Sequence, residues 1–326
     1  MYSTHRFLVE YIKKYLNKGK VKIMASVNYA EKYERALAQA YPNVLHFSEL
    51  HNTENNVKYT FLDAKTIHIP FLTTTGRKNV NRDGIDGQFA RNVDNGNQTL
   101  TMQFYREWST LIDPADMDET NQVLTIQNAT KVFNETQKFP EKDAYLISKV
   151  FKDFREAGGS VNTTELTTAN VLTVFDKLME DMDEANVPAV GRILYATPAV
   201  KTLLKEAQAI SRSINVDGSN DETIKRLVSR LDEVNIQTVP SSLMKTAYTF
   251  DNGYSAADGA GQVNMFLVHP SSVITPEKYE FAGTEDPSAH TKGDYLYYEK
   301  SYEDVFIINN RIAGIAFNIT PGSGSY

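Results

Sequence analysis

The amino-acid sequence predicts an α+β fold, and the order of its hydrophobic patterns leads to that class. Two stretches of alternating hydrophobicity, residues 64–72 and 98–108, predict an early pair of strands. Three helical stretches follow between residues 118 and 185, and short strands mixed with a helix occupy the chain from residue 192 onward. A strand pair, then helices, then a mixed region is typical of α+β proteins and not of a doubly wound parallel sheet.

The composition is that of an ordinary globular protein. Of the 326 residues, 41% are hydrophobic and 23% are charged, which is enough apolar mass for one large domain or two modest ones. The chain contains no cysteine, which excludes disulfides, thiolate metal sites and cysteine nucleophiles. No apolar run approaches the roughly 20 residues that a membrane-spanning helix requires, so no membrane partner is expected.

The first 23 residues differ from the rest of the chain in charge. They hold six basic residues against Glu10 alone, a net charge of +5, so the remainder carries −12 within the total of −7. Apolar residues between Phe7 and Tyr15 repeat at helical spacing, which fits an amphipathic membrane or partner helix. We favour the hypothesis that residues 1–23 are a mis-called extension and that the native protein begins at Met24. An intact mass that includes Met1 contradicts this hypothesis.

The stretch before the first strand predicts little core structure. Residues 29–41 have the apolar spacing of a short helix, which Pro42 ends. Residues 43–62 are mixed and polar, which is typical of an extended arm and not of a core element.

A long polar segment, residues 73–97, separates the two early strands and is rich in Gly, Asn, Asp and Arg. Compact domains rarely contain so long a loop unless a function or a partner orders it. A two-stranded arm is also poorly stable alone. We therefore expect this hairpin to pack on a neighbouring molecule.

Three helices are predicted in the middle of the chain. The first runs from Asp118 to about Gln137, the second opens near Pro140 and closes at Gly158-Gly159, and the third runs from about Thr164 to Ala185. Their expected inward residues are Val123, Ile126, Thr130 and Phe133, then Ala144, Ile147, Phe151 and Phe154, then Leu172, Phe175, Met179 and Met182.

The second half predicts short strands around one helix. Thr197 as N-cap and Pro198 at the first helical position open a helix that reaches about Ile210. The predicted strands are residues 192–196, a hairpin of 227–231 and 234–239 that turns at Asp232-Glu233, and residues 264–269, 278–282, 294–300 and 304–319.

No constellation of residues points to catalysis. The six histidines are scattered without ligand spacing, and the glycines near residue 259 match no phosphate-binding loop. Asp113, Asp116, Asp118 and Glu119 lack the glycine and the distant glutamate of a calcium loop, so helix capping is the favoured role. Trp108 is expected to pack in the core. The prediction is no enzyme, with no catalytic, cofactor-binding or metal residues and no cofactor.

Four motifs carry a resemblance to a known family. Phe139–Lys149 (FPEKDAYLISK) resembles a proline-acid-x-Asp-Ala-Tyr segment of the major capsid proteins of tailed bacteriophages, where it opens the helix after the long spine helix. Three further similarities follow in the family's order. They are residues 187–198, residues 231–240, and residues 264–274 together with 295–315, including Asp304–Ile307. The resemblance covers roughly Ala25 to Ile319, and it departs at Asp232-Glu233, where glycine is expected.

This resemblance implies the Hong Kong ninety-seven type capsid fold. Its parts fall here as an N-arm (24–58), an extended β-hairpin E-loop (59–112), a peripheral P-domain with the spine helix (113–160 and 274–303) and an axial A-domain (161–273 and 304–326). In such shells the E-loop reaches over an adjacent subunit. Four basic residues at its tip are then candidate contacts with acidic neighbours: Arg77, Lys78, Arg82 and Arg91.

The implied function is a structural subunit of a virion. It self-assembles into pentamers and hexamers of an icosahedral shell that encloses double-stranded DNA without sequence-specific binding. The implied partners are a portal and a separate scaffolding protein, and assembly takes place in the cytoplasm of the bacterial host. Lys78 is the natural candidate for a covalent crosslink, but no crosslink is predicted.

Two other functions remain open from the sequence. One is an encapsulin-type nanocompartment, which loads cargo enzymes through a peptide groove. The other is a soluble enzyme or binding module whose site lies outside known motifs. Negative-stain microscopy separates shells from a soluble monomer, and the nucleic-acid content of the shells separates a phage capsid from a nanocompartment.

Overall fold

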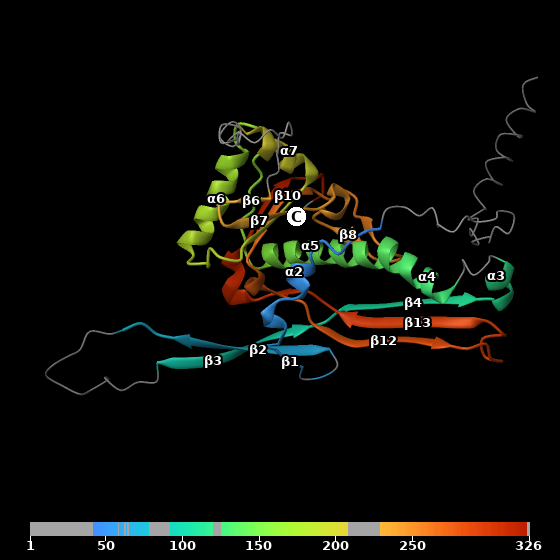
Figure 1. Cartoon of the computed structure of the whole chain (residues 1–326). Helices are drawn as coiled ribbons and strands as arrows, with labels where there is room; N and C mark the ends of the chain where they lie inside the picture. The colour runs from blue at the N-terminus through green and yellow to red at the C-terminus, as the bar shows by residue number, and fades with distance from the viewer. Residues whose placement is uncertain are drawn as a thin grey trace, which may run out of the picture.

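The computed structural model describes residues 42–57, 59–61, 63, 65–77, 92–119, 125–207 and 229–324. These residues form a body of helices and strands (Figure 1). A hairpin arm projects from one end of the body, and a long helix lies over a three-stranded sheet toward the other end. The predicted mixture of helices and strands is confirmed. The extension proposed for residues 1–23 and the helix predicted at 29–41 lie outside the described residues.

A five-stranded sheet forms the centre of the body, in the order β15-β10-β5-β7-β6. The β5–β7 pair is parallel and the other pairs are antiparallel. The strands are Ile315–Thr320 (β15), Gln262–Val268 (β10), Ile193–Ala196 (β5), Val234–Thr238 (β7) and Arg230–Leu231 (β6). The predicted turn at Asp232-Glu233 is confirmed, and Asp232 takes the left-handed conformation (φ 51°) for which glycine was expected.

Helices cover both faces of this sheet. Helix α5 (Phe139–Glu156) packs on the face that carries Phe266, whereas Met265 and Leu267 point to α6 (Val171–Glu184) and α7 (Pro198–Glu206). Because both faces are covered, every residue of β5 is buried. This explains why its sequence is a continuous apolar run without alternation.

Helix α4 (Ile126–Phe133), a π turn (Asn134–Lys138, η2) and α5 form one continuous rod, although the sequence predicted two separate helices. Pro140 causes the π turn, because it has no N–H to donate to the carbonyl that a regular helix would pair with it. Phe139 N donates to Asn134 O five residues back, which leaves Glu135 O without a helical donor. Asn43 supplies the missing donors, because its backbone N and its Nδ2 both donate to Glu135 O at 3.2 and 3.0 Å.

The end of α5 follows the prediction closely. Its four predicted inward residues are all buried. Gly158 has a φ of +84°, its N–H bonds to Arg155 O at 3.0 Å, and Gly159 N bonds to Phe154 O at 2.8 Å. These two hydrogen bonds are the Schellman arrangement that a glycine pair favours at a helix end.

A second, three-stranded sheet lies under the rod, in the antiparallel order β12-β13-β4 (Figure 1). Its strands are Glu277–Glu285 (β12), Tyr295–Glu303 (β13) and Phe104–Ile112 (β4). Trp108 of β4 is half-buried and stacks on Phe133 of α4, with ring centroids 3.9 Å apart. Trp108 therefore packs at the junction between sheet and helix and lies outside the buried core clusters, where the sequence had placed it.

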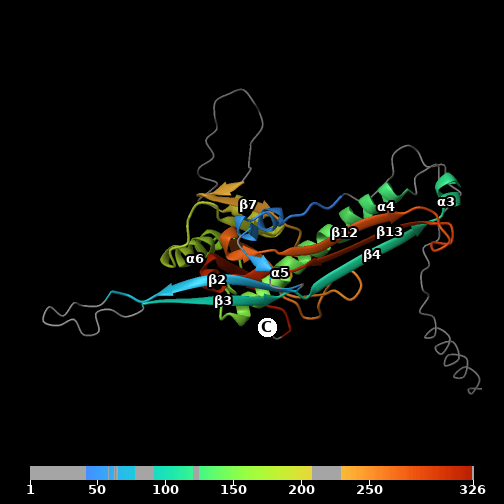
Figure 2. The same ribbon diagram turned by 90° about the horizontal axis from the view of Figure 1, so that it is seen from below.

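The predicted hairpin is present as a projecting arm. Strands β2 (Thr66–Thr74) and β3 (Val93–Thr101) pair antiparallel from Thr66↔Thr101 to Thr74↔Val93, and the short β1 (Thr60–Phe61) joins the base of β2. Figures 1 and 2 show that the far part of the arm extends well beyond the body.

The single strand predicted at 98–108 is wrong. Strand β3 ends at Thr101 and β4 begins at Phe104 in another sheet. Met102 between them is buried, its N–H bonds to Lys65 O, and Gln103 N bonds to Asp304 Oδ2 at 2.7 Å. The chain changes sheets here because these tertiary partners replace the strand ladder.

Two other predicted elements are shorter than expected. Helix α6 starts at Val171 instead of Thr164. Thr164 O accepts from Asn318 Nδ2 of β15, and the side chain of Asn170 bonds to Thr167 N and Glu165 O, so these backbone groups have partners outside a helix. In its predicted stripe Phe175 and Met182 are buried, whereas Leu172 and Met179 are half-buried. Helix α7 ends at Glu206, with Thr197 at the N-cap position but without a side-chain capping bond.

The strand predicted at 304–319 is also wrong. It is divided into β14 (Phe306–Ile307), a 3-10 segment (Asn309–Gly314, η5) and β15. The remaining short elements are α2 (Ser48–His51), η1 (Glu54–Val57), α3 (Pro114–Glu119), η3 (Ser241–Leu243), β8 (Tyr248–Thr249), β9 (Ser255–Ala256), η4 (Pro270–Ser272) and β11 (Val273–Ile274).

Candidate functional site

The arm exposes apolar side chains in the far half of its ribbon. Leu72 is 65% exposed, Val93 is 45% exposed and Phe71 is 38% exposed. Arg77 follows β2 and is exposed. The other three predicted contact residues, Lys78, Arg82 and Arg91, lie outside the described residues.

The base of the arm is held to the body by an apolar cluster, in which Ile67 and Met102 pack against Tyr302 and Phe306, and by the side chain of Gln98. Gln98 Nε2 donates to Ile307 O at 3.1 Å and to Asn309 Oδ1 at 3.0 Å. Gln98 Oε1 accepts from Asn309 N at 3.2 Å. Gln98 therefore bonds to the body through both ends of its amide group, beside the apolar cluster.

A second junction is built on the first turns of α5, the segment that carries the family resemblance. Asp143 is fully buried, and its two carboxylate oxygens accept hydrogen bonds from His46 N (2.9 Å) and Phe47 N (3.2 Å). Burial raises the pKa of Asp143 to about 7, although these two hydrogen bonds act in the opposite direction.

The segment that Asp143 holds is part of the core, so the expectation of a wholly extended arm at 43–62 is wrong. Phe47 and Leu50 are fully buried, and the Phe47 ring lies 4.6 Å from the ring of Tyr195 in β5. Little in the sequence indicated this, because the apolar residues of this stretch are interspersed with polar ones and do not repeat at a strand period.

Tyr145 joins the same helix to the chain after β13. Its hydroxyl donates to Asp304 Oδ1 at 2.7 Å, and its ring stacks on Phe104 with centroids 3.8 Å apart. Asp304 also accepts from Val305 N (2.8 Å) and Gln103 N (2.7 Å), and burial raises its pKa. Two motifs of the resemblance, around residues 139–149 and 304–307, are therefore the two sides of one contact.

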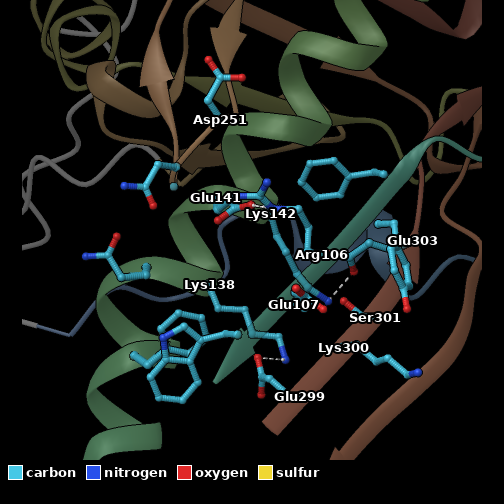
Figure 3. Close-up of a pocket in the computed structure, with 17 residues that line it drawn as sticks. Arg106, Glu107, Lys138, Glu141, Lys142, Asp251, Glu299, Lys300, Ser301 and Glu303 are labelled. Atoms are coloured by element: carbon cyan, nitrogen blue, oxygen red, sulfur yellow. Dashed lines mark ion pairs between the residues drawn. The ribbon is translucent and has the colours of Figure 1, made fainter. Parts of the chain in front are cut away.

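Charged side chains line a cavity of about 570 Å³ between the rod and the outer sheet (Figure 3). Three ion pairs cross from helix to strand: Arg106 with Glu141, Lys138 with Glu299 at 3.3 Å, and Lys142 with Glu303 at 2.6 Å. Burial acts against the ammonium group of Lys142, but Glu303 and Glu277 hold its pKa above the usual value.

These ion pairs join the rod to the outer sheet. Each cation that the helix or β4 directs into the cavity already faces a carboxylate, so these pairs leave no net charge to attract an ionic substrate. In the described ranges, no three His, Asp or Glu side chains come close enough together to hold a metal ion. Over the same ranges, no helix has the length and apolar character to cross a membrane.

Sequence reasoning missed the roles of Asp143, Tyr145 and Asp304. One signal was available for Asp143, because it precedes Ile147 by four residues and so stands on the inward stripe of α5. An acid in an apolar stripe must find hydrogen-bond donors, and these come from a segment 96 residues away.

Comparisons with known proteins identify the fold. No family model matches the sequence. No curated protein matches it either. The mature capsid of bacteriophage PhiM1 is similar in structure, with a TM-score of 0.63, 14% identity and coverage of 88% of this chain and 90% of that one. The capsid of cyanophage P-SCSP1u is similar with a TM-score of 0.60, 12% identity and coverage of 88% and 91%.

A structure from Mycobacterium phage Che8 gives a TM-score of 0.59 at 14% identity, with coverage of 88% of this chain and 96% of that chain. The likeness thus spans nearly the whole of each protein. The chain has the capsid fold of tailed bacteriophages, as the resemblance of its sequence predicted.

Proposed function

We propose that this protein is the major capsid subunit of a tailed bacteriophage, which assembles into pentamers and hexamers of an icosahedral shell around double-stranded DNA. The observation that carries the proposal is the projecting arm. Its apolar side chains Phe71 and Leu72 stay exposed, and a two-stranded ribbon is poorly stable alone. A second copy supplies the missing contacts in a shell.

The parts implied by the resemblance give each structural unit a role. The N-arm (24–58) includes the segment held by Asp143, and the E-loop (59–112) includes the arm. The P-domain (113–160 and 274–303) includes the rod and most of the outer sheet. The A-domain (161–273 and 304–326) includes the central sheet, and β15 as its returning strand supports this division.

The charge of the protein suits a container for DNA. Outside residues 1–23 the chain carries −12, whereas gripping phosphate backbones requires clustered Lys and Arg. An acidic shell repels packaged DNA and leaves it mobile. Filling through a portal, assembly on a separate scaffolding protein and formation in the host cytoplasm complete the proposal.

Shortening the arm is expected to abolish assembly while preserving the subunit. Replacing residues 75–92 by Asn-Gly joins Thr74 to Val93, which already face each other in register, through a two-residue hairpin turn. We expect a shell yield at least about tenfold lower by negative-stain microscopy, because the tip contacts are lost. The thermal midpoint of the unassembled subunit should stay close to that of the wild type. Shells at wild-type yield would contradict the proposed role of the arm.

The content of the particles separates a phage capsid from a nanocompartment. Particles isolated from producing cells are expected to protect double-stranded DNA from added nuclease. Particles that contain a protein cargo and no DNA would favour the encapsulin-type function, and a discrete monomer under all assembly conditions would exclude both.

A further inference from the structure

The sequence contains two Asn-Gly pairs, and both occur in the same tripeptide. Asp94-Asn95-Gly96 lies in β3, and Asp251-Asn252-Gly253 lies between β8 and β9. An asparagine followed by glycine is prone to spontaneous deamidation, because glycine has no side chain to hinder attack by its backbone nitrogen on the asparagine amide. Since the preceding residue is also the same, the local sequence gives both pairs a similar intrinsic reactivity. Their surroundings in the fold distinguish them.

The pair at Asn95 is held in a strand ladder. Strands β2 and β3 pair without a shift in register, and hydrogen-bonded pairs alternate with non-hydrogen-bonded pairs along such a ladder. Thr75 N donates to Asn92 O at one end of it. In steps of two from there, Gly96 and Phe71 form a hydrogen-bonded pair, so the Gly96 N–H points to Phe71 O. The Phe71 ring also covers Gly96, since a Cβ atom on this glycine would lie 2.5 Å from Phe71 Cζ.

The pair at Asn252 stands at the tip of a short hairpin. The two residue pairs between β8 and β9 leave residues 250–254 as the turn. Asn252 is exposed, and Gly253 has a φ of +73°. Apart from its chain neighbours, the atom nearest to the open side of Gly253 is Gln137 Oε1, 3.9 Å from the place of a Cβ atom. Neither the Asn252 side chain nor Gly253 N makes a hydrogen bond to the described part of the chain.

Both ends of this turn are anchored, whereas its tip is not. Phe250 O accepts from Arg106 Nη1 at 2.7 Å, and the Phe250 ring packs edge-on against the ring of Phe104 with centroids 5.5 Å apart. At the other end, Tyr254 packs against the main core cluster. Exposure does not separate the two sites, because the side chain of Asn95 is exposed as well. The difference is the backbone hydrogen bond that the following glycine makes in one site and lacks in the other.

We propose that Asn252 is a site of spontaneous deamidation and that the strand ladder protects Asn95. The Gly253 N–H gives up its proton to a solvent base, and the nitrogen forms a bond to Asn252 Cγ. The bond from Cγ to Nδ2 breaks, and the side-chain nitrogen takes up a proton and leaves as ammonia. Water then opens the cyclic imide at either of its two carbonyls, which gives aspartate or isoaspartate. Water is the only co-reactant, and no electrons are transferred.

The product changes the charge of the cavity between the rod and the outer sheet, which Asn252 lines. Figure 3 shows its neighbour Asp251 apart from the three ion pairs of that cavity. The new carboxylate joins five that line the cavity beside four cations: Glu107, Glu141, Asp251, Glu299 and Glu303, with Arg106, Lys138, Lys142 and Lys300. Stored protein therefore becomes a mixture of charge forms. Because Asn252 is exposed, the change in charge should affect stability little.

Peptide mapping by mass spectrometry measures both sites in one sample of the folded, unassembled full-length protein kept at mildly alkaline pH. We expect Asn252 to convert at least about tenfold faster than Asn95, because ring closure at Asn95 requires the ladder to open first. In concentrated urea the two rates should become similar, since the tripeptides are identical. Similar rates in the folded protein, or an Asn252 that resists conversion, would overturn the proposal. A difference that persists in urea would also overturn it, because local sequence would then be the cause.

Asn252→Gln and Asn95→Gln form a matched pair of variants. Glutamine keeps the amide, but its longer side chain must close a larger ring, which is slow. On native isoelectric focusing, stored wild-type protein should gain acidic species. The Asn252→Gln variant should lose most of this gain, and the Asn95→Gln variant should keep it. The reverse pattern, or an undiminished gain in Asn252→Gln, contradicts the assignment. Neither measurement involves assembly, so its failure leaves the proposed capsid function intact.

Discussion

Asp304→Ala is expected to lower the free energy of unfolding by roughly 3–6 kcal/mol, the largest effect of any single substitution considered for this protein. The side chain is 2% exposed and accepts three hydrogen bonds, from Tyr145 Oη, Gln103 N and Val305 N. Alanine removes the acceptor of all three donors, of which Val305 N is buried and the other two are partly buried. The loss is therefore that of three hydrogen bonds to one carboxylate and not that of a single contact.

The measurement is urea unfolding of the unassembled subunit, followed by the fluorescence of Trp108, the only tryptophan. Two graded controls accompany it. Asp304→Asn can keep the oxygen that serves Tyr145 and Val305, and Tyr145→Phe removes a single donor, so each should cost about 1–2 kcal/mol. If Asp304→Ala remains within about 1 kcal/mol of the wild type, the proposed joint between the rod and residues 304–307 is wrong.

Asp143→Asn is expected to change how stability depends on pH. The pKa of Asp143 is raised to about 7 from 3.8, chiefly by burial. The folded protein therefore holds this proton between those pH values, whereas the unfolded chain releases it. Proton binding by the folded state raises the free energy of unfolding. This contribution is present in full below pH 3.8, declines as the pH rises and is lost above about pH 7.

Asparagine has the shape of the protonated acid but never ionises. The stability of the variant relative to the wild type should therefore increase by up to about 1.4 kcal/mol per pH unit from about pH 5 to 7, and then level off. Urea unfolding at a series of pH values from about 5 to 8 measures this difference. Asp143→Ala, which also leaves His46 N and Phe47 N unpaired, should be destabilised at every pH. A difference between the Asp143→Asn variant and the wild type that stays constant over this pH range would be incompatible with a buried acid of raised pKa.

Much of the local structure follows from patterns that the sequence displays. Alternating apolar residues predicted β2, and the spacing of Ala144, Ile147, Phe151 and Phe154 predicted the inward face of α5. Gly158 closes that helix because only a residue without a side chain adopts a φ of +84° at little cost. The long polar hairpin was also visible, since no compact domain accounts for it.

Other features depended on partners that are distant in the sequence. Pro140 was expected to begin a new helix, yet the rod continues because a π turn absorbs the missing N–H and Asn43 satisfies the freed carbonyl. Thr164 was expected to begin a helix, but its carbonyl accepts a hydrogen bond from Asn318 of β15 instead. In both cases a hydrogen bond to a residue about 90 or more positions away outweighed the local preference.

For the arm and the contacts at its base, too, some features were visible in the sequence and others only in the tertiary structure. The basic residues of the arm tip and the acids after β4 are legible in the sequence, and so is the absence of cysteine. Only the tertiary structure showed that the arm projects from the body and that Tyr145 meets Asp304 across 159 positions. Periodicity and turn residues report the conformation of neighbouring residues, because they act through contacts a few positions apart. Which strand lies beside which, and which edge is left open, is determined by packing between segments that no local pattern specifies.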